Sequence, residues 1–578
     1  MRSSPVWEGL LASTMSLTSP QFLAFALAAV ILLRLAPAGA LRRVTIFGLN
    51  GIFLFSMVKA PVQLVPLAGF VLLGYGAILI AGRAKSGLWL GILVTGLVGI
   101  FIWLKRYPIV SAFPTFNFAF TVVGLSYILF RILHILIDVG QGCLRRPSFI
   151  AYLNYVFFFL SLLSGPIQRY EDFAPQEERR PPPPGWEEVN SSAKRVVLGY
   201  LMVIVMGSAT NNFVEMAKAP FFDALGQSKV VFGIYLFALL TFAYLLNLFV
   251  NFAGYMNIVI GVGILAGIVL PENFDHPFRS ESFLDLWSRW HITLSNWFKS
   301  YLFNPLLRML GARWGTKNSI PYLGAIAFYV TFFVMALWHG TTSIFVVYGL
   351  FLGSGVTVNR LWQILMPKFF GKSNYKELSS RRWYFQLSRA ATMSYLAIAL
   401  TSFWIDGEQA AKLARSSGPA ILFGSFLLMT VVGAGLGHLW EISAPKVRDI
   451  LGWGQGGPVN EAKTLAVRSG TLRTIAIPMM ALTLASAAAA TVALFASRGL
   501  AGSSLPHAIV TLVLFTVTLA VTCVAGGVLD PPLSRYLSSR APQRQADAAA
   551  LWLGVRGFIV VSLAVVLNSA PAFIYQAF

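Results

Sequence analysis

Long apolar runs separated by short polar intervals dominate the chain, and several of these runs contain no charged residue, including 46–58, 62–82, 86–104 and 557–578. About 20 consecutive apolar residues are enough to cross the hydrocarbon core of a bilayer as a helix. The pattern therefore predicts an all-α polytopic membrane protein and excludes a soluble multidomain protein.

The apolar pattern predicts sixteen membrane helices, and some of these runs are expected to be re-entrant or interfacial because the basic loops do not alternate cleanly between the two sides. They lie near 21–38, 44–60, 62–82, 86–104, 118–139, 148–166, 195–217, 230–250, 254–270, 320–340, 342–365, 385–405, 419–441, 473–497, 508–529 and 555–576.

Three polar segments interrupt this pattern. Residues 169–195 contain four consecutive prolines, Pro181 to Pro184, and predict a stiff loop between helices. Residues 271–318 are long and rich in aromatic side chains, and residues 366–389 are basic, which favours a cytoplasmic position. After about residue 415 the chain is rich in Ala, Val and Leu, so its last four helices are expected to be a scaffold or a partner-docking appendage.

Composition supports the membrane assignment. Charged residues make up 11% of the chain, and 44 Lys and Arg against 22 Asp and Glu give a net charge of +22. Basic cytoplasmic loops and attraction to anionic headgroups explain this excess, and we expect no nucleic-acid partner because no nucleic-acid-binding module is present. Cys143 and Cys523 are too few for a disulfide framework or a thiolate metal site. The first apolar run ends at Arg34 without a cleavage site, which indicates a retained first helix.

Residues 283–302 have the periodicity of an amphipathic helix that is too polar to span a membrane. Its polar side carries Arg289, and His291 falls on the apolar face, where burial favours the neutral, basic imidazole. The alternative for His291 is an ordinary buried histidine with a backbone partner. The apolar face recurs at spacings of three and four residues, at Phe283, Leu286, Trp287, Trp290, Leu294, Trp297, Phe298 and Tyr301.

His339 ends an apolar run and is followed by Gly340. Ionisable groups at the edge of a membrane helix are costly and usually functional. A neutral imidazole can take a proton from a hydroxyl and return it later, as a general base for acyl transfer must do. Gly340 lets a substrate or another part of the chain approach closely. The alternative is a histidine that is hydrogen-bonded at a helix end.

The remaining candidates point to structure. His134 lies one helical turn before Asp138, a spacing that suits a structural hydrogen bond, and Ser295 more often satisfies the helix backbone than acts as a nucleophile. His276, His438 and His507 lie in a loop or in the C-terminal region. No histidine pair has zinc spacing, so we predict no metal site, and the motifs of nucleotide-binding loops and serine hydrolases are absent from the sequence.

Four ordered blocks resemble the membrane-bound O-acyltransferase family, in particular the bacterial branch of alginate O-acetylation and teichoic-acid D-alanylation. The longest comprises 271–280, Trp287 to Ser295 and Tyr301 to Leu306, and LWHG at 337–340 matches the segment that carries the family's histidine. SGPIQRY at 164–170 and GLSY at 124–127 fit two more blocks, and 401–410 fits a later one weakly. The sequence departs from the family at Asn251 and Asn257, where two acids are usual.

The resemblance implies a catalytic core over 118–415, preceded by N-terminal helices over 1–117 and followed by additional C-terminal helices over 416–578. In such a core, helices surround a tunnel through the membrane. His339 would be the general base and His291 a second catalytic or orienting group. Other side chains would shape the tunnel or simply pack, namely Arg289, Trp287, Trp290, Trp297, Trp338, Asn251 and Ser295.

The function implied is transfer of an acyl group, acetyl in the first instance, from a cytoplasmic thioester to a hydroxyl of a cell-surface polysaccharide. The donor would be acetyl-CoA, with no permanently bound cofactor, in a bacterial inner membrane. An extracytoplasmic partner acyltransferase is expected to complete the transfer. Three alternatives stay open: D-alanyl transfer from a carrier protein, a transporter, and a non-enzymatic scaffold of a polysaccharide export complex.

Overall fold

The computed structural model describes Leu17 and residues 19–58, 60–84, 86–114, 116, 124–415 and 418–450. Within these residues the secondary structure is helical apart from one isolated β-bridge between Phe274 and Trp290. This confirms the all-α class. The helices predicted near 473–497, 508–529 and 555–576 lie outside the described residues.

The described helices follow one another in chain order with short connections. They are α2 (Pro20–Leu35), α3 (Ala40–Phe55), α4 (Val65–Ala84), α5 (Gly87–Leu104), α6 (Leu125–Gly140), α7 (Phe149–Val156), α8 (Tyr170–Glu178), α9 (Trp186–Tyr200), α10 (Ser208–Gly226), α11 (Val230–Ala266), α12 (Phe283–Leu286), α13 (Ile292–Phe298), α14 (Asn304–Trp314), α15 (Ile320–His339), α16 (Ile344–Phe369), α17 (Lys372–Ser380), α18 (Arg382–Ala399), α19 (Gly407–Arg415) and α20 (Gly418–Ile450). Two π-helical segments, η3 (Leu201–Gly207) and η5 (Lys299–Phe303), join α9 to α10 and α13 to α14. Four short 3₁₀ segments are η1 (Pro61–Leu64), η2 (Pro108–Val110), η4 (Pro277–Arg279) and η6 (Leu400–Phe403).

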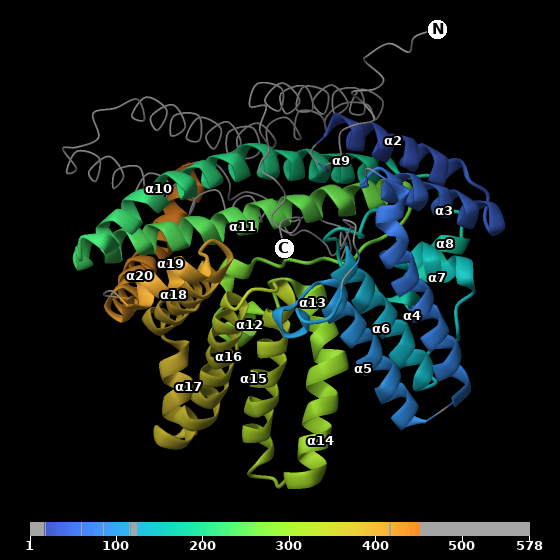
Figure 1. The fold of residues 1–578 in the computed structure, drawn as a ribbon. Helices are drawn as coiled ribbons and strands as arrows, with labels where there is room; N and C mark the ends of the chain where they lie inside the picture. Colours follow the sequence, from blue (N-terminus) through green and yellow to red (C-terminus); the bar gives the residue numbers. More distant parts are fainter. Residues whose placement is uncertain are drawn as a thin grey trace.

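The helices form two sets that meet at the centre of the molecule. The continuous α9–α10 helix and α11 run along one side, and α4 to α6 and α14 to α16 extend away from them at a steep angle (Figure 1). Among the described residues, seven helices are long and apolar enough to cross a membrane. These spans are Pro61–Arg83, Gly87–Leu104, Glu187–Gly226, Val230–Ala266, Ile320–His339, Ile344–Phe369 and Gly418–Leu439.

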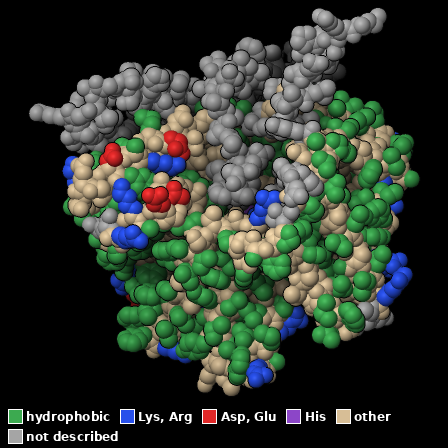
Figure 2. Space-filling view, viewed as in Figure 1, with side chains coloured by type: hydrophobic (Ala, Val, Ile, Leu, Met, Phe, Trp, Pro, Cys, Tyr) green, Lys and Arg blue, Asp and Glu red, His purple; other side chains and the backbone are tan. Residues whose placement is uncertain are grey.

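The surface agrees with a lipid environment. Large apolar side chains are exposed along α2, α3, α5 and α16, such as Leu27, Leu88 and Val358. Figure 2 shows that apolar side chains cover much of the visible face, while Lys and Arg gather near its edges. Contact with the lipid tails of a bilayer makes the exposure of these apolar side chains favourable.

Two predicted helices, 230–250 and 254–270, form one continuous helix, so the predicted break is wrong. Polar residues at and after the predicted break are accommodated inside α11. Asn251 Nδ2 donates to the carbonyl of Asn247 at 2.9 Å, and Asn257 Nδ2 donates to that of Ala253 at 2.8 Å. Because these amides bond to the preceding turn, the helix continues through them.

The run predicted to span at 148–166 is also wrong, because α7 ends at Val156. The fully buried Arg131 of α6 donates to the carbonyls of Tyr155, Val156 and Ser161 at 2.7–2.9 Å. These carbonyls therefore find their partners in a side chain, and the following segment turns without completing a helix.

The proline-rich interval is shorter than predicted. Residues 169–195 were expected to form a loop, but α8 and the start of α9 occupy most of them. The loop is confined to 179–185, which contains the four prolines. Proline lacks the backbone N–H that a helix interior uses and its ring clashes with the preceding turn, so four consecutive prolines interrupt the helical pattern here.

The single amphipathic helix predicted over 283–302 is wrong as well. Helix α12 ends at Leu286, and His291 has φ of +46°, in the left-handed region that interrupts a helix. Backbone pairing with the preceding segment replaces the helical bonds: Asp275 N donates to Arg289 O at 2.9 Å and Ile292 N donates to Asn273 O at 3.0 Å. Helix α13 starts only after this pairing.

Candidate active site

His339 is the last residue of α15 and is 7% exposed. Its ring lies among aromatic rings from three elements, with centroids 4.8 Å from Trp338, 5.8 Å from Tyr348 and 5.4 Å from Phe403. Helix α15 therefore delivers an ionisable group into an apolar interior, as its sequence predicted.

Gly340 explains how the chain leaves α15 at this point. A Cβ atom on Gly340 would lie 2.0 Å from the ring of Phe345, so no other residue fits without moving that ring. The close approach predicted for Gly340 is thus made by a side chain of α16. Phe345 in turn packs edge-on against Phe403 at 5.3 Å, which completes the wall beside His339.

His291 stands immediately before α13, and the buried Asn273 fixes this junction. The side-chain oxygen of Asn273 accepts hydrogen bonds from Thr293 N at 3.1 Å and Thr293 Oγ1 at 2.9 Å. Thr293 Oγ1 also accepts a bond from Ile167 N at 3.0 Å. Three motif segments that are separate in sequence are thereby tied together around His291.

The His291 ring is 1% exposed, and neither of its nitrogens has a hydrogen-bond partner among the described residues. Its ring centroid lies 4.8 Å from that of Phe252 in α11. Burial lowers the pKa of His291 to about 3, so the imidazole is neutral at physiological pH. The ring interacts with the backbone of His291 itself, and no other residue in the described part of the chain bonds to it.

The structure brings the two histidines together, since His291 lies within electrostatic range of His339. Lys105, which directly follows α5, also interacts with His339 and was not anticipated from sequence. Burial lowers the pKa of Lys105 to about 8. The Lys105–Arg106 pair after an apolar run indicates an anchor at the membrane edge, so only the fold reveals that Lys105 has His339 as a neighbour.

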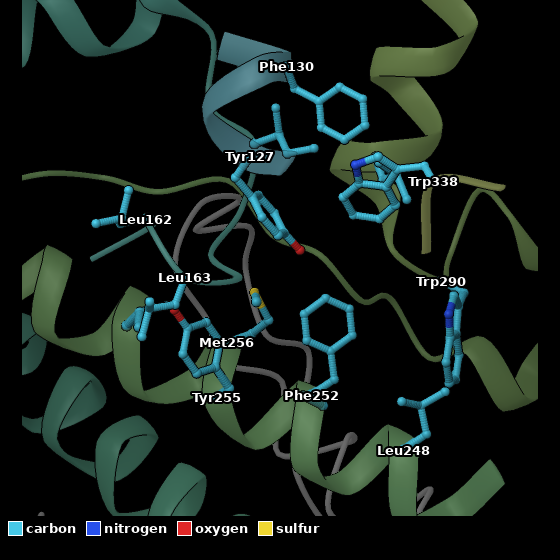
Figure 3. Close-up of a cluster of buried hydrophobic side chains, with 14 of the residues drawn as sticks. Tyr127, Phe130, Leu162, Leu163, Leu248, Phe252, Tyr255, Met256, Trp290 and Trp338 are labelled. Carbon is cyan, nitrogen blue, oxygen red and sulfur yellow. The ribbon is translucent and has the colours of Figure 1, made fainter. Parts of the chain in front are cut away.

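Two of the predicted tryptophans share one neighbour near His339. The Trp338 and Trp297 rings lie 5.0 and 4.4 Å from that of Phe130. Trp297 Nε1 donates to the Phe130 carbonyl at 3.2 Å, whereas Trp338 Nε1 has no partner among the described residues. Figure 3 shows Trp338, Phe130 and Tyr127 on one side of the buried cluster, with Phe252 and Met256 of α11 opposite.

Trp287 and Trp290 lie further along the same interior. Trp287 packs against Phe332 at 5.1 Å, and its Nε1 has no described hydrogen-bond partner. Trp290 forms the β-bridge with Phe274 and packs against Phe249 at 5.8 Å. Both are buried and belong to the wall of the interior.

The three remaining residues that were predicted to shape the tunnel differ in their hydrogen-bond partners. Arg289 is engaged by carboxylates, with Nε 3.1 Å from Asp285 Oδ2 and Nη1 3.8 Å from Asp275 Oδ2. Asn251 is buried against Gly207 of η3, and its amide nitrogen bonds within α11. Ser295 Oγ is buried with no described hydrogen-bond partner, so the backbone bond expected for it is not seen.

A polar network surrounds His134 in α6. Its Nδ1 lies 3.0 Å from Asp138 Oδ2 and 2.6 Å from the Tyr301 hydroxyl, which confirms the predicted hydrogen bond to Asp138. Its Nε2 accepts from Tyr170 N at 3.0 Å and lies 3.4 Å from Glu171 Oε2. Contact with His134 lowers the pKa of Glu171 to about 2. Ligand atoms of the His134, Asp138 and Glu171 side chains lie within 4.8 Å of one another, a spacing that a metal ion can use, but hydrogen bonds already engage both ring nitrogens.

A cavity of about 930 Å³ opens beside this network, between α5, α6 and α14. Its polar side includes Asp138, Tyr301, Arg169 and Arg308, and its apolar side includes Leu90 and Val94. The Tyr301 ring packs against Trp297 at 5.0 Å. Trp297, Phe130 and Trp338 then form a continuous path of ring contacts from the cavity to His339.

The chain is similar in sequence to several proteins named as acyltransferases. It is 28% identical over 342 residues to teichoic acid D-alanyltransferase of Bacillus subtilis, which covers 58% of this chain and 82% of that protein. It is 27% identical over 239 residues to the probable alginate O-acetylase of Pseudomonas putida, covering 41% of this chain and 45% of that protein. It is 29% identical over 237 residues to peptidoglycan O-acetyltransferase of Helicobacter pylori, covering 41% and 42%.

The model of the membrane-bound O-acyltransferase family matches residues 22–401. This match covers the spans α4 to α16, both candidate histidines and the aromatic interior between them. The family match and the apolar helices together show that the protein is an integral multi-pass membrane enzyme of the O-acyltransferase type. As its motifs predicted, the chain belongs to the membrane-bound O-acyltransferase family.

Proposed function

We propose that this protein transfers an acetyl group from acetyl-CoA to a hydroxyl of a cell-surface polysaccharide, with His339 as general base. The observation that carries the proposal is the burial of His339 and His291 within electrostatic range of each other, in an interior lined by aromatic rings. A thioester is already activated, so the remaining tasks are removal of the hydroxyl proton and stabilisation of an oxyanion.

In this proposal the histidines have different tasks. His339 takes the proton of the acceptor hydroxyl as its oxygen attacks the thioester carbonyl, and later gives that proton to the departing thiolate. His291 is neutral and carries an N–H that no described residue uses, so it orients the acceptor or donates to developing charge. Asn251 is less suited to that task because its amide nitrogen bonds to the Asn247 carbonyl.

The cavity beside Tyr301 is the proposed entrance for the donor. Its two arginines, Arg169 and Arg308, provide positive charge for the phosphates of acetyl-CoA, and its apolar side accommodates the pantetheine chain. The ring contacts from Tyr301 through Trp297 to Trp338 give the direction in which the thioester would extend toward His339. Helices would then enclose a tunnel, with the acceptor approaching from the opposite side.

The proposal places the enzyme in a bacterial inner membrane, where a cytoplasmic thioester and an extracytoplasmic glycan meet on opposite sides. The similarity to a probable alginate O-acetylase of Pseudomonas putida and to peptidoglycan O-acetyltransferase of Helicobacter pylori supports an acetyl group and a polysaccharide acceptor. An extracytoplasmic partner acyltransferase would receive the acyl group or complete its transfer.

A second candidate function is D-alanyl transfer from a carrier protein. The extent of the alignments favours this second function. The alignment with the Bacillus subtilis teichoic acid D-alanyltransferase covers 82% of that protein, whereas the alignments with the two acetylating relatives each cover less than half of the relative. The chemistry at His339 would be the same, because a carrier-bound D-alanyl group is also a thioester. The two functions differ in the donor and in what must fit the cavity.

The test is transfer of label from radiolabelled acetyl-CoA in membranes that contain the glycan and any genetically linked partner. Label in glycan or partner is expected with wild type, and His339→Ala should reduce it by at least about 10²-fold while the protein stays folded. The control His276→Asn removes a histidine that pairs with Asp275 in a loop. A wild-type rate in His339→Ala would contradict the base assignment. A folded wild type that uses only a D-alanyl carrier would replace the acetyl proposal by its alternative.

A further inference from the structure

Trp338 presents a buried donor that has no acceptor in the described part of the chain. Its side chain is 8% exposed, and its Nε1 has no hydrogen-bond partner there. An indole nitrogen can only donate, and most buried donors in native proteins are paired, so an unpaired one calls for an explanation. One explanation is an acceptor that arrives with the substrate.

The surroundings of Trp338 contain a hydrogen-bond acceptor that an indole N–H can use, as the neighbouring Trp297 shows. Both rings pack on Phe130, and Trp297 uses the carbonyl of that residue at 3.2 Å. Trp338 contacts Phe130 at 5.0 Å and Tyr127 edge-on at 5.8 Å, which fix the plane of its ring (Figure 3). Its donor is therefore held in place before any ligand is present.

Location separates Trp338 from Trp404, another buried tryptophan whose Nε1 has no described hydrogen-bond partner. Trp404 packs against Phe221 and Phe237, on the side of α10 and α11. The Trp338 ring centroid instead lies 4.8 Å from that of His339. A donor beside the group that removes the hydroxyl proton is well placed for the atom on which negative charge then develops.

We propose that Trp338 Nε1–H donates a hydrogen bond to the thioester carbonyl oxygen as it becomes an oxyanion, an inference that rests on the proposed acyl transfer. The acceptor oxygen bonds to the carbonyl carbon while His339 takes the hydroxyl proton. The carbonyl π electrons move to the oxygen that Trp338 contacts. When the carbonyl re-forms, the C–S bond breaks, and the thiolate receives the proton held by His339. Trp338 keeps its own proton throughout.

An indole suits this task for physical reasons. It donates without accepting, it does not ionise at physiological pH, and its apolar body excludes water from the oxyanion. A donor that is fixed in advance needs no reorganisation when the charge appears, which is the condition under which such hydrogen bonds lower a barrier most. The Phe130 and Tyr127 contacts provide that fixation.

The test compares Trp338→Phe with Trp404→Phe, which removes another buried Nε1–H without a described acceptor, from a ring that packs against Phe221 and Phe237. Acetyl-CoA consumption is followed in membranes that contain the glycan, and affinity is measured with a non-reactive acetyl-CoA analogue in which methylene replaces sulfur. We expect Trp338→Phe to lower kcat by about 10²-fold or more, with analogue affinity within about threefold of wild type. Trp404→Phe should keep kcat within about threefold.

A second variant, β-(3-benzothienyl)alanine incorporated at position 338, keeps the shape of the indole and replaces N–H by sulfur. It should show the same loss of kcat, and it decides the matter if Trp338→Phe does not fold. Unchanged kcat in the benzothienyl variant, or an equal loss of kcat in Trp404→Phe, would overturn the assignment. A wild type that transfers from neither acetyl-CoA nor a D-alanyl carrier would instead overturn the proposed function, and the assignment with it.

Discussion

His134 and His291 are both buried histidines, but their surroundings differ. His134 contacts Asp138, Glu171, Tyr301 and a backbone N–H, so both of its nitrogens are engaged. His291 is equally buried, and neither nitrogen has a described partner. A complete network stabilises a fold, whereas an unpaired buried imidazole costs stability and is retained where a substrate supplies the partner.

Among the variants that test this difference between the two histidines, His291→Ala is expected to have the largest effect on turnover. Removal of this ring, which interacts electrostatically with His339, should lower turnover by about 10²-fold, because an orienting or charge-stabilising group is lost from the reaction. Turnover and thermal stability are to be measured on the same preparation. If only the melting temperature falls, His291 is structural and the contrast with His134 disappears.

Stability against pH provides a second view of His291. The unfolded ring binds a proton near pH 6.5, whereas the folded ring does so only near pH 3, so the unfolded state holds more protons between these values. Folding stability should therefore fall as the pH drops from 6.5 toward 3, by up to about 1.4 kcal/mol per pH unit for this group.

Chemical denaturation of wild type and His291→Ala at several pH values within that window measures the difference. The variant lacks the proton-binding ring and should show a shallower decrease over the same interval. If the free energy of unfolding depends on pH equally in both proteins, the folded His291 ring binds a proton as readily as the unfolded one. That result would contradict its isolation in an apolar interior.

The contrast between the two histidines was only partly visible in the sequence. The apolar runs predicted most helices, and the motifs singled out His291 and His339, because helix length and side-chain type are local properties. The spacing of His134 and Asp138 predicted their bond for the same reason. The contacts of His134 with Tyr301 and Tyr170 come from distant segments that no periodicity relates.

The errors at the site have one physical cause, which is backbone hydrogen bonding to remote partners. The pattern over 283–302 fits a helix, yet pairing of Asp275 with Arg289 and Asn273 with Ile292 interrupts it at His291. Arg131 similarly ends α7 early by bonding to carbonyls of the following turn. Lys105 was missed because its neighbour His339 is far away in sequence.

A smaller effect, on stability, is expected at the paired histidine. His134→Ala leaves Asp138, Glu171 and the Tyr170 N–H without this partner, and loss of one buried partner costs about 1–3 kcal/mol. The free energy of unfolding should therefore drop, and turnover per folded molecule should change less than in His291→Ala. A turnover loss as large as that of His291→Ala, at unchanged stability, would place His134 in the reaction and erase the distinction between the two regions.

The smallest effect is expected from Glu171→Gln, at the exposed edge of the His134 network. Contact with His134 lowers the pKa of Glu171 to about 2, below the 4.5 that is ordinary for a glutamate, so this carboxylate contributes stability above about pH 4.5 and loses it as the pH falls toward 2. The side chain is 46% exposed, and solvent therefore limits the contribution to less than about 1 kcal/mol. Thermal unfolding between pH 4.5 and 2 should show a weaker acid dependence in the variant than in wild type. Asp172→Asn removes a carboxylate from the same helical turn and is the matched control, so an equal change in both variants would attribute the effect to the charge of α8 and not to the contact with His134.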